Sequence, residues 1–503
     1  MKKLPVGLQS FRDIREEDWL YVDKTESVFR VIETGKFCFF ARPRRFGKSL
    51  AVSTMYELFR GNRKLFEGLW IEPHWDWSRA APVIWLRFAV MAEPTGDLLT
   101  DLNHQLQEIA TGYGIELSSD NPGRRFAGLI KQLHAQHGKV VVLVDEYDKP
   151  LVDHLDRPER LEANRELLRA FYGVLKDSDP YLRFVFITGV SAFSKVSLFS
   201  AMNNLQSITL DPVTETLAGF TETEIDTYLT PYLGNLDREV LRYWYNGYSW
   251  TGKVRVYNPF SLLSALNSGS IRNFWFATGT PYFLIKLMRK HRMVNLKLGE
   301  IVRDQLTSFE PTHIDPVGLL FQTGYLTIVR PDELSPQFYY LDYPNQEVRQ
   351  SLQAHLLNSF GENEPIDTRG RALRMAKALL SNDLARFFEQ LDALFAAVPY
   401  DLWNRDGEFT YHAVLYLTFE LLGIPIQSEV HTKHGRADAV VELPEVVYAF
   451  EFKWNDSVAA ALRQIEANGY LDPYRGGDRR LVAVGVQFGG EERRVLDWEA
   501  VER

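Results

Sequence analysis

The stretch VVVLVDEYDKP (140–150) holds five consecutive apolar residues followed by Asp145 and Glu146. A short apolar run of this kind predicts a fully buried strand, and such strands belong to parallel sheets covered by helices on both faces. An aspartate at the end of a buried strand is suited to hold Mg²⁺, and a following glutamate to orient an attacking water. The alternative is an ordinary strand that ends in solvated acidic residues. The acids alone therefore do not define a site, and a second sequence element is needed.

Three other apolar runs extend the sheet outward from this strand. They are FCFFA (37–41), VIWLRF (83–88) and RFVFITG (183–189), and helical patterns lie between them at 49–60 and 97–111. Strands that alternate with helices are typical of α/β folds with a parallel sheet. The N-terminal part of the chain is therefore predicted to be α/β.

The second element is ARPRRFGKSL (41–50), which follows one of these strands and precedes a helix. Backbone N–H groups and the helix N-terminus make such a loop a phosphate site. Gly47 permits close backbone approach, Lys48 would reach the β- and γ-phosphates, and Ser49 would ligate Mg²⁺. Arg42 stands where the standard phosphate loop has glycine, which predicts a different loop shape. A surface turn before a helix remains the alternative.

The two elements in this order favour a nucleotide site. A third strand, FVFITGVSAFSK (184–195), ends in Thr188 and Ser191, either of which could contact the γ-phosphate or the attacking water. The alternative is an ordinary capped strand end. We therefore predict Mg²⁺ ligation by Ser49 and Asp145, a catalytic Glu146, and nucleotide binding by Arg45, Gly47, Lys48, Ser49, Asp145 and Thr188.

The first 300 residues resemble the AAA-ATPase-like domain of many bacterial proteins. The resemblance is carried by six separated segments: YVDKT (21–25), RPRRFGKSL (42–50), VDEYDKPL (144–151), ITGVSAFSK (187–195), YNGYSW (245–250) and YNPFS (257–261). It implies a P-loop NTPase sheet with a helical lid, and it implies ATP binding. Because Arg42 departs from the standard loop, the resemblance leaves hydrolysis open.

A second site is predicted in VYAFEFKW (447–454), an apolar strand interrupted by Glu451 and Lys453. Side chains two positions apart on a strand share a face. A tight turn at 444–445 would pair 443 with 446 and set Asp438 opposite Glu451. Two such carboxylates suit Mg²⁺ or Mn²⁺, and Lys453 could position water or stabilise charge on a phosphate. A cross-strand ion pair of Glu451 with Lys453 at a solvated edge is the alternative.

The order of elements around this strand resembles the PD-(D/E)XK nuclease superfamily. A helix at 409–422 and strands at 424–432, 436–443 and 446–454 precede a helix at 455–470. The resemblance implies that Asp438 and Glu451 are metal ligands, Lys453 is the catalytic lysine and Glu408 is an accessory acidic ligand. Gln464 and Tyr470 resemble the superfamily's downstream helix motif.

Other residues near the second site compete for these roles. Glu420 and Glu429 are rivals of Glu408, and each is more often a surface acid. His412 follows Glu408 by one helical turn and so shares its face, but a packed or solvated histidine is the commoner case.

The chain is predicted to be an α/β multidomain protein with a small α+β middle region. The predicted boundaries are 1–215 for the ATPase domain, 216–300 for the lid, 301–375 for a winged-helix-like module or linker, and 376–503 for the nuclease-like domain. The polar segment 362–371 is the best candidate for a linker. A hairpin is predicted from 318–329 and 338–344.

Composition limits the classes of function. The chain has 503 residues, a formal charge of −9 and a single cysteine, Cys38. A net negative charge means that contact with nucleic acid needs a local basic patch. One cysteine, no signal sequence and no long apolar run predict a soluble cytoplasmic protein without membrane contact.

Two functions are consistent with these patterns. The first is an enzyme, an ATPase joined to a Mg²⁺- or Mn²⁺-dependent nuclease that cleaves nucleic acid, DNA in the first instance, under NTP control. The second is an NTP switch that binds nucleic acid or protein without cutting. The patterns leave open whether the protein forms a homo-oligomer.

Overall fold

A computed structural model describes residues 1–88, 97–154, 157–190, 202, 204–275, 282–296, 298–307, 315–361, 368–422, 426–431 and 436–503. Within these ranges, side chains are described except at 282–283, 368–369, 400–408, 426–431 and 436–438. The chain divides into two units, Met1–Phe283 with Leu296–Arg349, and Leu284–Asn295 with Gln350–Arg503. Each unit is considered by itself, and the finer division into four domains stays a prediction.

The first unit is built on a five-stranded sheet in the order β2-β3-β4-β1-β5, with every neighbouring pair parallel. The strands are β1 (Phe37–Ala41), β2 (Val83–Arg87), β3 (Val140–Asp145), β4 (Leu182–Gly189) and β5 (Gln206–Ser207). The four apolar runs of the sequence form β1 to β4, so the predicted parallel sheet is confirmed. Because β4 lies between β1 and β3, the ends of all three strands meet at one edge.

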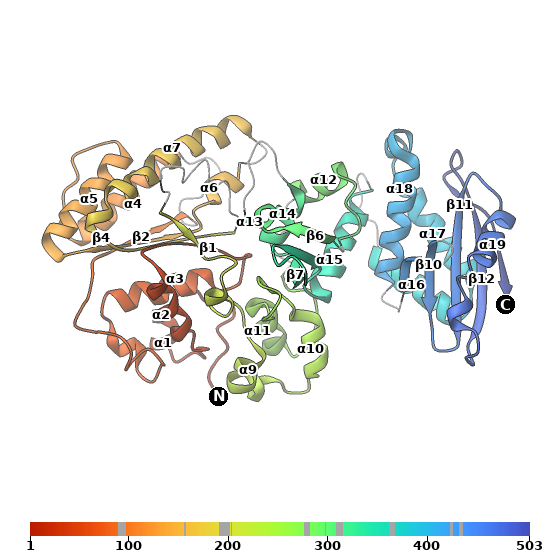
Figure 1. The fold of residues 1–503 in the computed structure, drawn as a ribbon, viewed down its shortest axis with the longest axis horizontal. Helices are drawn as coiled ribbons and strands as arrows, with labels where there is room; N and C mark the ends of the chain where they lie inside the picture. The colour runs from red at the N-terminus through yellow and green to blue at the C-terminus, as the bar shows by residue number, and fades with distance from the viewer. Residues whose placement is uncertain are drawn as a thin grey trace. The chain divides into compact units, whose positions relative to one another are not determined.

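Helices cover both faces of this sheet (Figure 1). On one face lie α1 (Phe11–Glu16), α2 (Thr25–Thr34) and α3 (Lys48–Phe59), and on the other α4 (Leu98–Gly112), α5 (Pro122–His137), α6 (Lys149–Val152) and α7 (Pro158–Asp177). Strands β1 and β3 are buried along their whole length. This burial explains their unbroken apolar sequences.

A helical region follows the sheet in the first unit. It contains α9 (Glu222–Glu224), which continues as a π-helix at Ile225–Leu229, then α10 (Arg238–Tyr245) and α11 (Pro259–Ser268). Asn258 starts α11, because its side chain accepts hydrogen bonds from the backbone N–H groups of Phe260 and Ser261. The buried core of this region includes Leu4 from the N-terminal segment.

The middle of the chain forms a three-stranded antiparallel sheet in the order β6-β8-β7. Its elements are β6 (Leu298–Val302), α13 (Arg303–Thr307), α14 (Pro316–Gln322), β7 (Thr327–Pro331) and β8 (Phe338–Asp342). The hairpin prediction was right for β7 and β8 but wrong for residues 318–322, which are helical. Asp315 accepts a hydrogen bond from Val317 N, and Pro316 occupies the first turn, so the sequence starts a helix there.

Two further helices have these bounds: α12 (Tyr282–Lys290) and α15 (Gln346–Asn358). Residues 362–367 of the predicted linker lie outside the described residues. Within the described ranges, no helix has the length and apolar character that a membrane-spanning segment requires.

The second unit contains a mixed five-stranded sheet in the order β13-β12-β11-β10-β9, in which only β11 and β12 pair in parallel. Its strands are β9 (Ile426–His431), β10 (Arg436–Glu442), β11 (Val446–Trp454), β12 (Arg480–Gly489) and β13 (Arg494–Glu502). Its helices are α16 (Thr368–Leu380), α17 (Leu384–Ala396), α18 (Tyr400–Leu421) and α19 (Val458–Ala467).

The two faces of β11 have different neighbours. Phe450 packs against Phe387 of α17 and Phe419 of α18. Val447 and Ala449, on the opposite face, share a buried cluster with Ile465 of α19. Glu451 and Lys453 have the same parity as Val447 and Ala449, so they belong to the α19 face.

Candidate functional sites

Arg42, in the glycine position of the loop, is a buried structural residue. Its guanidinium donates hydrogen bonds to the carbonyl oxygens of Ala41 (2.9 Å), Thr209 (2.7 Å) and Thr214 (3.1 Å). The guanidinium also stacks over the ring of Trp250, 3.8 Å from its centroid. Burial lowers the pKa of Arg42 well below its ordinary value, against the opposing effect of Glu215. Arg42 thus connects the end of β1 to segments far along the chain.

The backbone of the loop turns at two other positions. Arg45 has φ 66° and Gly47 has φ 91°, both in the left-handed region. A non-glycine residue in that region is strained, and such strain clusters at binding sites. The guanidinium of Arg45 lies over the ring of Phe260, 3.9 Å from its centroid.

Lys48 and Ser49 form the first turn of α3. The Lys48 ammonium donates hydrogen bonds to the carbonyl oxygens of Arg42 and Pro43, both at 2.9 Å. Burial lowers the pKa of Lys48, while the charges of Glu146 and Asp145 act to raise it. The ammonium therefore sits between the loop and the acids at the end of β3.

The acids at the end of β3 are held in place by β4. Asp145 is buried, and its Oδ1 accepts a hydrogen bond of 2.7 Å from the hydroxyl of Thr188. Thr188 is fully buried, so the structure places it as a partner of Asp145, while Ser191 lies outside the described residues. Glu146 has φ 55°. Burial raises the pKa of Glu146, and the charge of Lys48 opposes that effect.

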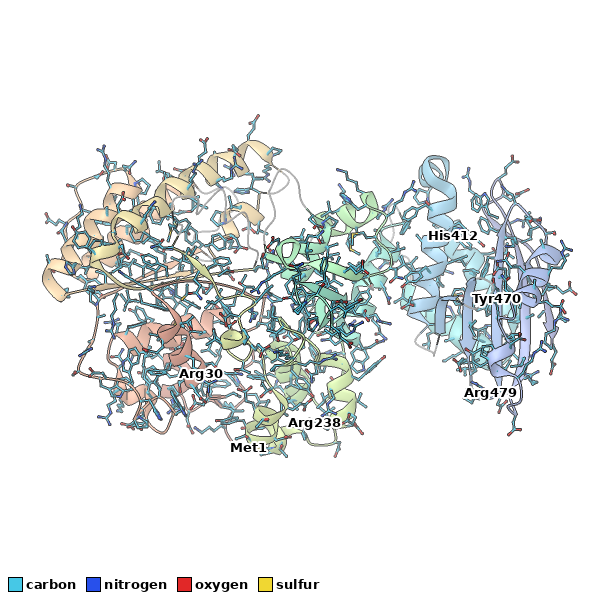
Figure 2. The ribbon with its side chains drawn as sticks, in the orientation of Figure 1. Met1, Arg30, Arg238, His412, Tyr470 and Arg479 are labelled. Carbon is cyan, nitrogen blue, oxygen red and sulfur yellow. The ribbon has the colours of Figure 1, made fainter. Side chains whose placement is uncertain are left out.

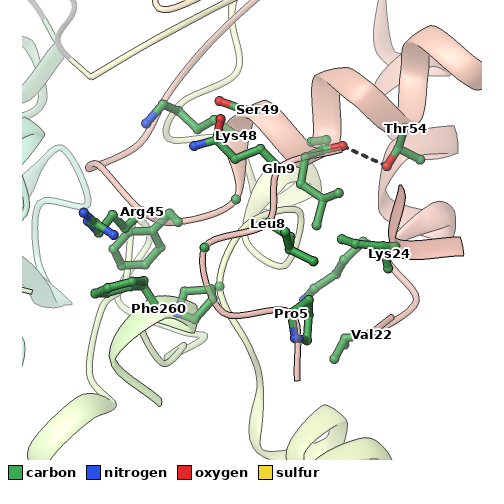
Figure 3. Close-up of a pocket in the computed structure, with 18 of the residues that line it drawn as sticks. Pro5, Leu8, Gln9, Val22, Lys24, Arg45, Lys48, Ser49, Thr54 and Phe260 are labelled. Carbon is green, nitrogen blue, oxygen red and sulfur yellow. Dashed lines mark hydrogen bonds between the residues drawn. The ribbon is translucent and has the colours of Figure 1, made fainter. Parts of the chain in front are cut away.

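Arg45, Gly47, Lys48, Ser49 and Glu146 border a cavity of about 550 Å³, a volume typical of small-molecule sites, whereas Asp145 and Thr188 are not among the residues that line it. Figure 3 shows Lys48 and Ser49 at one end of the cavity, Pro5 and Val22 at the other, and Arg45 with Phe260 along one side. Lys24 lies with Pro5 and Val22, so each end of the cavity holds a lysine, and apolar side chains fill much of the lining between polar groups. The apolar side chains include Pro5, Leu8, Leu20, Val22, Leu217, Phe220 and Leu263.

The N-terminal segment was missed as part of this site. Pro5, Leu8 and Gln9 line the cavity although they lie far from the loop in sequence. Lys24, in the YVDKT segment, also lines it and forms an ion pair of 2.6 Å with Glu224. Lys24 was the sequence feature that could have placed this segment at the cavity. Its ion pair with Glu224 could not be predicted, because the two residues are brought together only by the tertiary fold.

In the second unit, Glu451 and Lys453 lie side by side on β11. Glu451 is 3% exposed, and the Lys453 ammonium lies 2.9 Å from its Oε1. Lys453 also donates to Oε1 of Gln464 on α19, and Gln464 Nε2 donates to the hydroxyl of Tyr470 at 3.1 Å. Tyr470, labelled in Figure 2, is buried on the same face. The ion pair that the sequence offered as an alternative is present, but its carboxylate is buried, and Lys453, 21% exposed, is joined to α19.

Asp438 has the predicted backbone position. The pairs Ala439–Phe450, Val440–Ala449 and Glu442–Val447 follow the register expected from the turn at 444–445. Continuing that register by one residue sets Asp438 opposite Glu451. The side chains of Asp438, Glu408 and Glu429 lie outside the described residues.

Two other candidates near this site have structural partners. Glu420 accepts a hydrogen bond of 3.1 Å from Gln353 Nε2. The ring of His412 packs against that of Tyr411, with 5.2 Å between centroids. Among the described side chains, no three His, Cys, Asp or Glu residues form a metal-binding group.

Known proteins resemble both halves of the chain. A family model described as a predicted AAA-ATPase matches residues 5–199, and a model of the PD-(D/E)XK nuclease superfamily matches residues 406–498. One solved structure, the Aeropyrum pernix Orc1 protein in complex with DNA, covers 86% of this chain and 92% of its own. Its identity of 11% and TM-score of 0.28 are too low to support an argument.

A relative matches almost the whole chain. The protein described as "Uncharacterized protein in vnfD 5'region" of Azotobacter chroococcum mcd 1 is 42% identical over 514 residues, covering 98% of each chain. Both predicted resemblances are confirmed by the family models. The chain therefore belongs to the same family as this Azotobacter protein, and it joins an AAA-ATPase-like domain to a PD-(D/E)XK nuclease superfamily domain.

Proposed function

We propose that the protein binds and hydrolyses ATP in its first unit and cleaves nucleic acid at a metal-dependent site in its second. The observation that carries the nuclease assignment is the pairing of the buried Glu451 with the partly exposed Lys453, extended to Gln464. Glu451 and Gln464 hold the Lys453 ammonium in one orientation, as a catalytic group requires. An ion pair at the solvated surface would not need a buried carboxylate.

The nucleotide half of the proposal rests on the cavity of the first unit. Lys48 would bind the phosphates, and Ser49 with Asp145 would hold Mg²⁺. Glu146 would accept the proton of the attacking water, and burial raises its pKa toward the range that suits a general base. The apolar side chains of the lining would pack against the nucleobase.

The donor chemistry of the second site fits a hard divalent cation. Glu451 offers a buried carboxylate, and the backbone register brings Asp438 beside it. Glu408 is proposed as a further ligand. When bound, Mg²⁺ or Mn²⁺ would supply Lewis acidity at the phosphoryl oxygen. Lys453 would orient water and stabilise negative charge on the scissile phosphate, with its ammonium held by Glu451 and Gln464.

The proposal includes control of cleavage by the nucleotide, DNA as the nucleic acid, and a cytoplasmic location. A reducing compartment agrees with a chain whose single cysteine, Cys38, cannot form an intramolecular disulfide. Burial raises the pKa of the Cys38 thiol to about 12, so it is unreactive toward disulfide exchange at neutral pH.

The test is a cleavage assay on plasmid and single-stranded DNA with Mg²⁺ or Mn²⁺, each with and without ATP. Wild type is expected to cut, and Lys453→Ala to lose roughly 100-fold or more of the rate. Lys377→Ala, which removes an exposed lysine of α16, is the matched control and is expected to retain full activity.

The same assay separates the two functions. Wild type that binds DNA but cuts under none of these conditions would support the NTP switch and refute the nuclease. Equal cleavage by wild type and Lys453→Ala would refute the assignment of this site. For the first unit, Lys48→Ala is expected to abolish ATP binding, and unchanged affinity would remove the nucleotide assignment.

A further inference from the structure

Five basic side chains line the nucleotide cavity. They are Lys24, Arg44, Arg45, Lys48 and Lys149. An ATP molecule brings several negative charges, so each of these cations is a candidate for a phosphate contact. Their existing partners show which of them remains available for one.

Four of the five cations already have partners. Lys24 pairs with Glu224, and Lys149 pairs with Asp153 at 2.9 Å. Arg45 stacks on Phe260, and Lys48 is bound to two carbonyl oxygens of the loop. For Arg44, by contrast, no hydrogen bond or ion pair occurs within the part of the chain that the structure describes, and its side chain is exposed.

Arg44 and Glu146 both act on the ammonium of Lys48. The charge of Arg44 lowers the pKa of Lys48, in the same direction as the larger effect of burial, and Glu146 acts in the opposite direction. Two cations close enough to repel each other favour an anion between them. Glu146, the residue proposed to accept the proton of the attacking water, lines the same cavity as Arg44 and Lys48.

We propose that Arg44 contacts the γ-phosphoryl group of ATP and stabilises the charge that develops during its transfer to water. This inference rests on the proposed function of the first unit. In P-loop enzymes, an arginine in this role is supplied by the same chain or by a partner. Here the phosphate loop itself supplies it, so the site requires no arginine from a second copy.

The experiment compares ADP with a non-hydrolysable ATP analogue on the full-length protein. Arg44→Ala is expected to bind ADP within about 2-fold of wild type but the ATP analogue roughly 10-fold more weakly, since only the analogue has a γ-phosphate. At saturating ATP, kcat is expected to fall by roughly 10³-fold. The kcat per chain of wild type is expected to stay constant as the protein concentration is raised.

Arg124→Ala, which removes an exposed arginine of α5, is the control and is expected to match wild type in each measurement. Equal loss of affinity for ADP and the analogue, or no loss for either, would overturn the assignment of Arg44. So would a kcat per chain that rises steeply with protein concentration. Wild type that binds neither nucleotide would refute the proposed ATP site itself.

Discussion

In the helical region, the carboxylate of Glu222 accepts hydrogen bonds from several side chains. It accepts hydrogen bonds from Arg242 (2.8 Å), Arg238 (2.6 Å) and the hydroxyl of Tyr257 (2.8 Å). Burial acts to raise its pKa, but the hydrogen bonds from the two arginines and the tyrosine outweigh it and hold the pKa at about 2. The ionised form of Glu222 therefore joins α9, α10 and the segment before α11.

This shift predicts a pH dependence of stability. The folded pKa lies below the unfolded value of about 4.3, so the stabilisation is present above that pH and is lost as the pH falls toward 2. Glu222→Gln is expected to lower the melting temperature at pH 7 and to differ progressively less from wild type below about pH 4.3. Thermal unfolding at a series of pH values measures this.

Glu239→Gln is the matched control for Glu222, because Glu239 also pairs with Arg242 but is 73% exposed. It is expected to change the melting temperature little at any pH. A Glu222→Gln effect of constant size from pH 7 to pH 3 would contradict the assigned pKa.

At the scale of elements, the turn between α14 and β7 lies against the phosphate loop. Gly324 has φ 89°, and a Cβ placed there would lie 2.7 Å from Cβ of Pro43. The following residue, Tyr325, packs against Trp275 with 5.3 Å between ring centroids. The winged-helix-like assignment of 301–375 stays a prediction, but one turn of this region touches Pro43 of the loop at 41–50.

This contact predicts that Gly324→Ala displaces Pro43 and weakens ATP binding several-fold. The matched control is Gly138→Ala, at φ 85° with open space around the added methyl. Both variants are expected to lose roughly 1–3 kcal/mol of stability, because alanine is strained at a positive φ. Only Gly324→Ala is expected to change ATP affinity, which nucleotide titration measures. The same affinity in both variants would exclude this coupling.

The elements of the fold were predictable where local sequence decides them. The register of β10 and β11 followed from two-residue alternation and a short turn, and β1 to β4 followed from buried apolar runs. The helix at 316–322 was missed because its apolar residues also fit a strand, and only the cap at Asp315 distinguishes the two.

At the scale of the whole molecule, the division into two units predicts two unfolding transitions. Nucleotide bound to the first unit raises the stability of that unit alone, by about 2.7 kcal/mol at 100 times Kd. Calorimetry with and without Mg²⁺ and ATP is expected to shift one transition in wild type and none in Lys48→Ala. Equal shifts of both transitions, or a shift in Lys48→Ala, would contradict this assignment.

The candidate sites were predictable from sequence only in part, because they combine distant segments. The loop at 42–49 and the acids at 145–146 are recognisable locally. The apolar lining of the cavity is not, since Pro5, Leu8 and Phe260 come together only through the fold. Gln464 was singled out only by the resemblance to the superfamily's helix motif, and its contact with Lys453 became visible only in the fold.

The burial of Arg42 also limits how this phosphate loop can evolve. Replacing Arg42 with glycine would restore the standard motif but remove the guanidinium donors to the carbonyl oxygens of Thr209 and Thr214 and leave Trp250 beside a void. Arg42 and these partners therefore depend on one another, and a substitution of one of them alone is expected to lower stability. A chain of this kind reaches the glycine loop only through several simultaneous substitutions, so the arginine, once fixed, is expected to persist among its descendants.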